Sequence, residues 1–461
     1  MQKSSIGYQA RLWPPRQNSG LRHHIMNFKT KHIGLTGMWI LQGAVSFGAQ
    51  AVIAAYFGAS AGFDAYLVGT TLPTTIYMVI SSGLSAATTM YFNQVKAREG
   101  EAEAFQCISG LLVMALAVGI FLGSLLFVQA GRLVTGIAPG LSQTVSGEAV
   151  GCLKLTSMAL PFLMIYSLLT GFLNAQYMFF STTLAGTLLV GLVPLPVLLG
   201  APVSPDALAW GFNAGALGAC ALLLMVGLRS GGLGRPRMRW SDWKHASSIG
   251  LAPVGAAGSA HILWLFERYF ASSFDPGTIS ALNYGQRIVN FVAGGLTYAT
   301  STILLPYLSA WIEAGERERA AGFNRKTIIG TTICAAAGLI LLVGGGEWFV
   351  RLAYGRGKFD EAAIALTTTA VWLYLGVFVS YLYGVVINQN ALAMQETLVI
   401  AVGATTALLS YLVLAPLLMN TFGYRGLPVA ASTAFLISVL VSTRFMWRRY
   451  QAFYWNSAPH G

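Results

Sequence analysis

Apolar runs of about 20 residues recur along the whole chain, and short polar segments separate them. A helix of this length crosses the ~30 Å hydrocarbon layer of a bilayer and satisfies its own backbone hydrogen bonds there. The pattern predicts an all-α polytopic membrane protein of about twelve transmembrane helices. The predicted spans are 33–56, 64–91, 105–128, 150–174, 178–200, 207–228, 246–273, 277–309, 325–346, 362–388, 396–419 and 426–447.

The polar segments between these runs are too short to hold a soluble catalytic domain. The sequence FDPG at 274–277 has Pro and Gly at the centre of a turn, so the helices on either side form a tight hairpin. The longest segment on that side of the membrane is 129–149. These lengths argue against a membrane glycan polymerase or ligase, because such enzymes need a large outer loop.

An internal repeat divides the chain into two halves. Residues 82–105 resemble 294–323, and 166–176 resemble 380–390, at an offset of about 212 residues. Six spans per half is an even number, so the halves share one orientation and form two six-helix bundles related by a pseudo-two-fold axis along the membrane normal. The predicted divisions are a basic tail (1–32), an N-lobe (33–228), a basic linker (229–245), a C-lobe (246–449) and a C-terminal tail (450–461).

The distribution of basic residues predicts the orientation. Of the 28 Lys and Arg residues, 20 fall in segments on the side of the termini or at the span ends that border them, and five fall on the opposite side; the other three, Lys154, Arg268 and Arg287, lie within spans. The positive-inside rule then places both termini in the cytoplasm. It also accounts for the net charge of +12 without a nucleic-acid partner. We expect the basic tail to be disordered, with residues 1–25 as a candidate extension before Met26.

Composition agrees with this class, since 55% of residues are hydrophobic and only 10% are charged, against about 25% charged in a soluble protein. The four cysteines lie singly in apolar runs, and no phosphate-binding loop or clustered metal-ligand motif occurs. We therefore expect no cofactor and no metal.

Arg287 is the candidate substrate-binding residue. It follows the FDPG turn by ten residues, which places it about 15 Å deep, near the middle of the bilayer. Asn283 and Asn290 share its helix face. An arginine at this depth needs an anion, a carboxylate or water. It could grip a phosphate with two hydrogen bonds or pair with Glu267.

Glu267 and Arg268 lie on the helix before the same turn, and His261 lies two turns before Arg268. One hypothesis is that Glu267 neutralises an arginine in the empty protein and yields it to substrate, which makes Arg268 a further candidate substrate-binding residue and Glu267 a candidate coupling site. The alternative is a permanent ion pair of Glu267 with Arg287 or Arg268.

Two further charges allow two interpretations each. Asp64 opens the second span and could stabilise its own helix N-terminus or act as a gate. Lys154 could reach the membrane interface or enter the cavity as a substrate ligand. Arg356 and Lys358 belong to an outer loop, as solvated charges or as contacts on the exit path.

Five segments, in order along residues 33–447, carry a family resemblance. They are AAYFGASAGFDAYLVGTTLP (54–73), GIAPGL (136–141), FASSFDPGTISALNYGQRI (270–288), TILLPYLS (302–309) and YGRGKFDEAAIALTTTAVWLYLGV (354–377). In these the chain resembles the multidrug/oligosaccharidyl-lipid/polysaccharide exporter superfamily, and within it the MurJ/MviN family of lipid II flippases. The resemblance implies a transporter, not an enzyme, that moves a lipid-linked glycan across a bacterial inner membrane.

The chain also departs from the family pattern. Family members carry arginines in the first two helices, where this chain has Gly43, Ala49, Tyr77 and Met78, and an acid where it has Gln50. They have fourteen helices, against about twelve here. Asp64 and Arg287 are kept, so the resemblance implies the fold more strongly than it implies lipid II as the substrate.

The sequence thus predicts a flippase for a polyprenyl-diphosphate-linked saccharide that works by alternating access. The substrate would be a peptidoglycan-precursor-like lipid or a repeat unit of capsule or exopolysaccharide. Expected partners are that lipid, membrane lipids and glycan-assembly enzymes, with a monomeric protein. The alternatives are a cation-coupled drug exporter of the same fold and a non-transporting scaffold.

Overall fold

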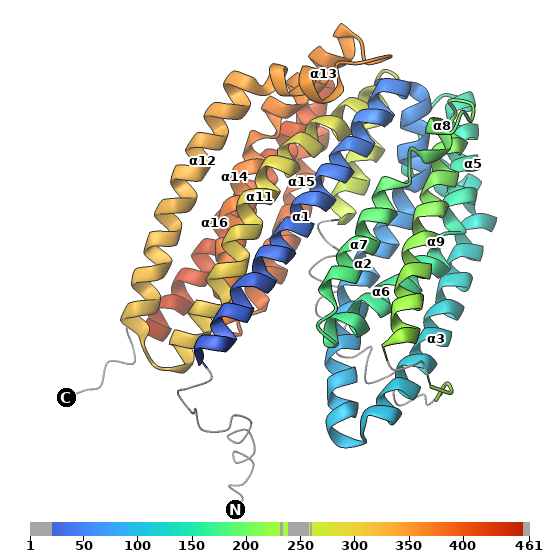
Figure 1. The fold of residues 1–461 in the computed structure, drawn as a ribbon. Helices are drawn as coiled ribbons and strands as arrows, with labels where there is room; N and C mark the ends of the chain where they lie inside the picture. Colours follow the sequence, from blue (N-terminus) through green and yellow to red (C-terminus); the bar gives the residue numbers. More distant parts are fainter. Residues whose placement is uncertain (1–20, 231–233, 238–257, 259–260, 455–461) are drawn as a thin grey trace, which may run out of the picture.

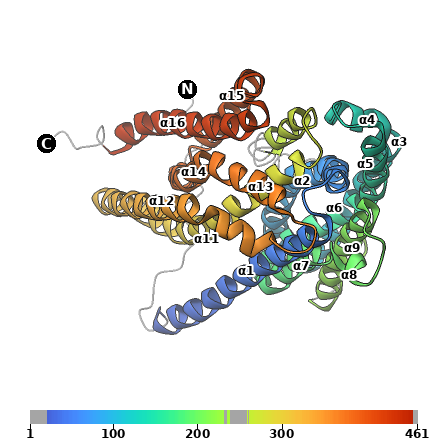
Figure 2. The same ribbon diagram turned by 90° about the horizontal axis from the view of Figure 1, so that it is seen from above.

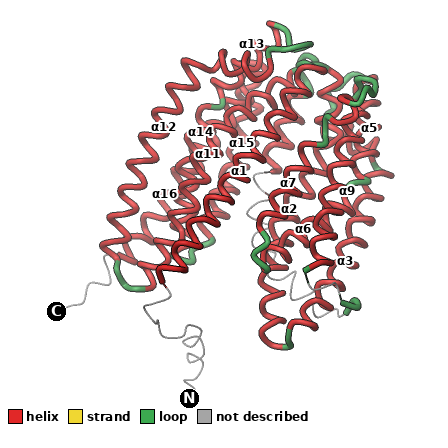
Figure 3. Tube along the Cα trace, in the orientation of Figure 1, coloured by secondary structure: helices red, strands yellow, loops and turns green. Residues whose placement is uncertain are grey.

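The computed structural model describes residues 21–230, 234–237, 258 and 261–454. All regular secondary structure in these ranges is helical (Figure 3). Residues 1–20 of the expected tail 1–32 and most of the linker 229–245 lie outside the described residues. The first helix begins at Leu21, well before the apolar run itself.

The N-terminal half consists of eight helices in the described ranges. With the short α8 counted together with α7 as one broken element, they are α1 (Leu21–Phe57), α2 (Ala61–Arg98), α3 (Glu101–Val128), α4 (Ala130–Ile137), α5 (Gln143–Ser157), α6 (Leu160–Ala175), α7 (Phe179–Gly191) with α8 (Leu195–Leu198), and α9 (Pro205–Arg229).

The C-terminal half begins with a helix at 261–271, directly before the FDPG turn. The helices that follow are α11 (Thr278–Glu313), α12 (Arg317–Tyr354), α13 (Glu361–Leu373), α14 (Leu375–Ala393), α15 (Leu398–Phe422), the 3-10 turn η1 (Gly423–Arg425) and α16 (Gly426–Tyr454).

Each predicted span coincides with one helix or with a broken pair. The exception is the span 246–273, whose first part, 246–260, lies almost wholly outside the described residues. Span 150–174 is α5 and α6, bent by 45° where they join. Span 178–200 divides into α7 and α8 beside Pro194, and 362–388 into α13 and α14 at Tyr374. Seven helices in the described ranges, or eight with the bent pair, are long and apolar enough to cross a membrane.

The two halves form separate bundles, as the views from the side and from above show (Figures 1 and 2). The bundles meet at the end opposite the start of α1 and the last turn of α16, which we call the closed end. They spread apart toward the end where α1 begins and α16 ends. The predicted two-lobed helical architecture is confirmed, and α1 packs against α7 of its own half and also contacts α11 and α12 of the other half.

The helices α6 and α14, which contain the repeated segments, end in turns of the same geometry. The turn after α6 has Tyr177 at φ 61°, and the turn after α14 has Gln395 at φ 59°. In both turns the next N–H donates to the carbonyl five residues earlier, at 2.9 Å after α6 and 2.7 Å after α14. This is the Schellman end of a helix, and it recurs 218 residues apart.

Close helix packing within each bundle depends on small residues. The strongest case is α9 against the segment that joins α7 and α8. A Cβ atom on Gly211 would lie 1.9 Å from the carbonyl oxygen of Val193. This position therefore admits glycine alone without moving the two helices apart.

Candidate functional site

A cavity of about 480 Å³ lies between the two halves, on the termini side of the contacts that join them. Its walls come from α1, α2, α11, α14 and the helix at 261–271. The lining residues are Gly43, Ser46, Phe47, Gln50, Thr71, Thr74, Thr75, Met78, His261, Trp264, Leu265, Arg268, Asn283, Gln286, Arg287, Asn290, Phe291 and Tyr381.

The structure brings four of the predicted substrate-binding residues together in this cavity. Arg287, Asn283 and Asn290 line it from one face of α11, as the helical spacing predicted, and Arg268 lines it from the neighbouring helix. Arg287 Nε donates to Asn283 Oδ1 at 3.3 Å, so the amide one turn earlier orients the guanidinium. Their role in substrate binding stays a prediction.

Both cations of the cavity belong to the C-terminal half. The N-terminal wall offers small, hydroxyl and amide side chains, including Gly43 and Met78 at two of the positions where the family resemblance leads us to expect arginine. Gln50 is buried, and its Oε1 accepts no hydrogen bond from the described residues.

Arg268 bonds across the interface between the halves. Its Nη1 donates to the carbonyl oxygen of Leu67 at 2.8 Å and to the hydroxyl of Thr71, both on α2. It also lies close enough to Arg287 to interact with its charge. No salt bridge joins Glu267 to Arg268 or Arg287 among these described residues, so the permanent ion pair considered from the sequence is not present.

Glu267 instead lies inside the C-terminal half. Its side chain is 5% exposed, and Oε2 accepts no hydrogen bond from the described residues. Tyr374, Tyr381 and Tyr411 lie near Glu267, and the hydroxyl of Tyr411 is likewise without a hydrogen-bond partner in the described ranges. A small void beside Glu267 is lined by residues that also line the main cavity, including Trp264 and Arg268.

Sequence reasoning did not find this tyrosine cluster. Tyr374 and Tyr381 are seven residues apart and so share a helix face. This spacing could have predicted that the two tyrosines lie together. Tyr411 lies on α15 and has no sequence relation to the other two.

Asp64 connects the halves at the closed end. Ser60, not Asp64, caps the N-terminus of α2, because its hydroxyl accepts from Phe63 N–H. The Asp64 carboxylate accepts from the N–H groups of Gly277 at 2.6 Å and Ser280 at 2.7 Å, and also from the Ser280 hydroxyl. Asp64 therefore caps α11 of the opposite half, where the helix dipole favours a negative charge. It also lies in the first turn of α2, as the sequence predicted, although the side-chain cap of that helix is Ser60.

Other contacts complete the closed end. The Tyr284 hydroxyl donates to Gly58 O at 3.3 Å, and Lys358 N–H donates to Ala55 O at 2.8 Å. Beneath these bonds lies an aromatic cluster drawn from both halves, whose ring centroids are 4.8–5.8 Å apart for the pairs that include Tyr354. Its members are Phe47, Phe63, Tyr284, Tyr354 and Phe359.

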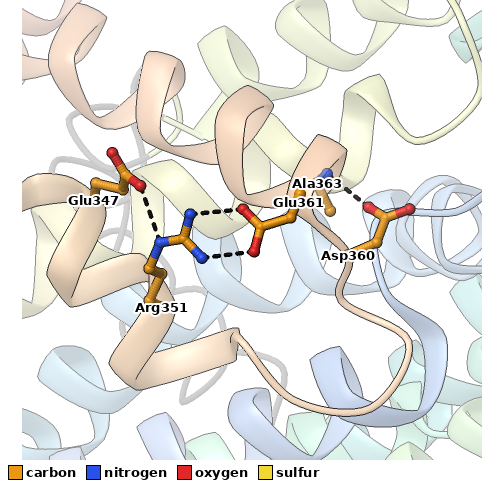
Figure 4. Close-up of polar contacts among 5 residues, drawn as sticks. All are labelled: Glu347, Arg351, Asp360, Glu361 and Ala363. Atoms are coloured by element: carbon orange, nitrogen blue, oxygen red, sulfur yellow. Dashed lines mark hydrogen bonds and ion pairs between the residues drawn. The ribbon is translucent and has the colours of Figure 1, made fainter.

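The loop that carries Lys358 is anchored by ion pairs at its two ends. Arg351, near the end of α12, binds Glu347 at 2.9 Å and Glu361 at 2.6 Å, while Asp360 caps α13 through Ala363 N–H at 2.8 Å (Figure 4). The hydrogen bonds from Arg351 lower the pKa of the Glu361 carboxyl.

The charged side chains of this loop do not line the cavity. Lys358 touches α1 through its backbone, and Arg356 donates to Leu352 O at 3.2 Å. Lys154 also lies away from the cavity. It is exposed on α5, and its ammonium lies 5.7 Å from the centroid of the Phe127 ring. The expectation that Lys154 binds substrate in the cavity is therefore not supported by its position.

No group of three or more potential metal ligands occurs in the described ranges. What the site offers is a polar cavity that contains two guanidinium groups and no carboxylate among its lining residues, closed at one end by contacts between the two lobes.

Known structures share the fold of this chain. The fold matches a structure of the lipid II flippase MurJ in an inward closed conformation, with a TM-score of 0.78 at 18% identity over 92% of this chain and 90% of that one. It also matches an inward-facing multidrug resistance MATE family transporter of the MOP superfamily, with a TM-score of 0.76 at 14% identity over 90% and 96%. The fold is that of the MOP superfamily transporters.

Sequence comparison identifies the family. The model of the lipid II flippase MurJ family matches residues 53–458, and the chain belongs to this family. It is therefore a membrane protein of a bacterial inner-membrane family.

Curated relatives carry the same name. Probable lipid II flippases MurJ from Bdellovibrio bacteriovorus and Buchnera aphidicola subsp. Acyrthosiphon pisum are 28% and 20% identical over 61% and 92% of this chain. The lipid II flippase MurJ of Burkholderia cenocepacia is 26% identical over 76% of this chain and 70% of its own length. The alignment spans 54% of the Bdellovibrio relative and 84% of the Buchnera one. Flippases are transporters, not enzymes.

Proposed function

We propose that the protein is a flippase that moves a polyprenyl-diphosphate-linked saccharide across the inner membrane by alternating access. The observation that carries this proposal is the pair Arg268 and Arg287, which face one cavity whose lining contains no carboxylate. Two guanidinium groups without an acid in a membrane cavity favour a dianionic group such as a diphosphate.

The state of the two lobes supports the direction of transport. With both termini in the cytoplasm, the closed end faces outward and the cavity lies on the cytoplasmic side of it. The head group would enter there, and the polyprenyl chain would stay in the bilayer between the lobes. The cavity can open to the outer side only if the contacts at Asp64, Tyr284 and Lys358 break.

The chemistry of the saccharide is open between a peptidoglycan precursor and another lipid-linked repeat unit. The relatives are named for lipid II. The neutral N-terminal wall, with Gly43 and Met78, favours a head group held by fewer cationic contacts than the family arginines would supply.

The test is transport of a fluorescent polyprenyl-diphosphate-linked saccharide in proteoliposomes. We expect Arg287→Gln to reduce transport at least 10-fold, since it removes charge-assisted hydrogen bonds worth about 1.5–3 kcal/mol each. Arg425→Gln is the matched control, because Arg425 is exposed at the closed end and bonds only Tyr424 among the described residues. Full transport by Arg287→Gln protein would refute the proposed site.

Glu267 supports a second part of the proposal, in which it binds the coupling ion. A buried carboxylate with an unpartnered oxygen beside three tyrosines can take up a proton or a monovalent cation, and the void beside it adjoins the cavity. The same observation favours the alternative of a cation-coupled exporter of small molecules. Saccharide transport that collapses with Glu267→Gln or with dissipated ion gradients supports coupled flipping. Dye efflux without saccharide transport would favour the exporter.

A further inference from the structure

Arg268 belongs both to the cavity and to the contact between the two lobes. It lines the cavity from the C-terminal half, and the same guanidinium donates to Leu67 O and to the Thr71 hydroxyl on α2 of the N-terminal half. One side chain therefore faces the cavity and also forms hydrogen bonds between the lobes.

The other hydrogen bonds between the lobes in the described ranges do not have this double position. They are the bonds of Asp64 to Gly277 and Ser280, of Ser280 to Ser60, of Tyr284 to Gly58, of Lys358 to Ala55 and of Gly140 to Ser272. None of these residues lines the main cavity. A ligand in the cavity can reach the closure directly through Arg268.

The partners of Arg268 are weak competitors for a guanidinium. Both are neutral, and Leu67 O already accepts from the hydroxyls of Thr70 at 3.2 Å and Thr71 at 2.7 Å. A phosphate offers paired, charged oxygens, and such bonds are roughly twice as strong as bonds to neutral acceptors. The charge of Arg287 nearby adds repulsion while the cavity is empty and attraction to the same anion when it is filled.

We propose that Arg268 acts as a tie between the lobes: its hydrogen bonds to α2 hold the lobes together until a diphosphate displaces them. In the empty protein it holds α2 against the C-terminal half at the closed end. A diphosphate between Arg268 and Arg287 accepts the hydrogen bonds of the Arg268 guanidinium in place of its two acceptors on α2. The contact of Arg268 with α2 is then lost. Because a ligand shifts a conformational equilibrium only through its different affinities for the two states, this exchange links loading of the cavity to opening of the closed end.

This inference rests on the proposed function, in that it takes a diphosphate as the natural ligand. It assigns Arg268 a positioning role in addition to binding. It predicts a conformational readout that a purely structural arginine would not give, namely opening in response to a phosphate-bearing lipid.

The experiment measures the distance across the closed end by double electron–electron resonance spectroscopy. Spin labels are placed at Gln143 on α5 and Thr421 on α15, which are exposed positions at that end of the two lobes. The protein sits in lipid nanodiscs with undecaprenyl diphosphate as the probe and undecaprenol, which lacks phosphate, as the control lipid. Native mass spectrometry records binding of each lipid separately.

Wild-type protein should be closed when empty or with undecaprenol and should open with undecaprenyl diphosphate. Arg268→Gln should raise the ratio of open to closed protein about 10-fold or more without lipid, as expected for loss of a hydrogen bond from a charged donor. It should respond little to the probe. Thr71→Val removes one acceptor and keeps the cavity charge, so it should shift the empty protein in the same direction by less.

The outcomes separate this inference from the proposed function. Wild type that binds undecaprenyl diphosphate and opens, while both variants rest closed as wild type does, overturns the tie and leaves the flippase proposal standing. Wild type that neither binds nor responds to undecaprenyl diphosphate overturns the release by diphosphate together with the proposed substrate.

Discussion

The contact between Asp64 and the start of α11 yields the sharpest prediction about the closed end. We expect Asp64→Asn to shift the resting protein toward the open state of that end. The carboxylate accepts three hydrogen bonds, from two backbone N–H groups and one hydroxyl. It is 2% exposed, so water does not replace these bonds in the closed state.

The size of the effect follows from what the amide can still do. Asparagine keeps one oxygen as an acceptor but turns an NH2 group toward a second donor, so at least one charge-assisted bond is lost. Such a bond contributes about 1.5–3 kcal/mol, and the favourable interaction with the dipole of α11 disappears with the charge. A loss of about 3 kcal/mol corresponds to roughly a 100-fold change in the ratio of open to closed protein.

The measurement is the distance distribution between labels at Gln143 and Thr421, in protein without substrate. Asp206→Asn is the matched control, because Asp206 also lies in the first turn of a helix but contacts Cys152 within its own lobe at 3.7 Å. The control should keep the wild-type distribution. A wild-type distribution in Asp64→Asn itself would mean that the aromatic cluster holds the closure and that the carboxylate adds nothing to it.

Three further substitutions test the packing and the loop. Gly277→Ala should also weaken the closure, because Gly277 has φ 91° and its Cβ would lie 2.5 Å from Ala59 O. A weaker closure would make a cysteine introduced at Ser280 more accessible to a polar alkylating reagent, and unchanged protection of that cysteine would count against the role of Gly277 in the closure. Gly211→Ala should lower the yield of monodisperse protein in size-exclusion chromatography, because its Cβ would clash with Val193 O at 1.9 Å, whereas Gly136→Ala, which has open space around it, should not. Arg351→Gln should leave the melting temperature almost unchanged, since exposed ion pairs contribute little to stability; a large drop would show that the ion pairs in Figure 4 hold the loop in place.

The sequence predicted those features that local periodicity determines. Helical spacing placed Arg287, Asn283 and Asn290 on one face, and the structure places all three in the cavity. Apolar length predicted the spans, and the prolines at 161 and 194 lie where two of them break. The break at Tyr374 has no such residue, so the sequence held no signal for it.

Features that depend on contacts between distant residues were not predictable. Asp64 meets Gly277 across 213 positions of sequence, and only the docking of two lobes decides that it caps α11 and not α2. Glu267 and Arg268 are adjacent, and their separation into the lobe interior and the cavity depends on the rotation of one helix. The sequence allowed Lys154 to reach either the membrane interface or the cavity. Its position over Phe127 follows from how α5 packs beside α3.

The placement of both cavity arginines on the C-terminal lobe makes the carrier mechanically asymmetric. When two lobes rock about a bound ligand, the ligand travels with the lobe that grips it and slides along the other. A diphosphate held by Arg268 and Arg287 would be cargo of the C-terminal lobe, while Gln50 and the threonines of α2 form a surface along which it moves. Under the proposed function, the symmetry of the fold would therefore not extend to transport, because one repeat would carry the ligand and the other would guide it.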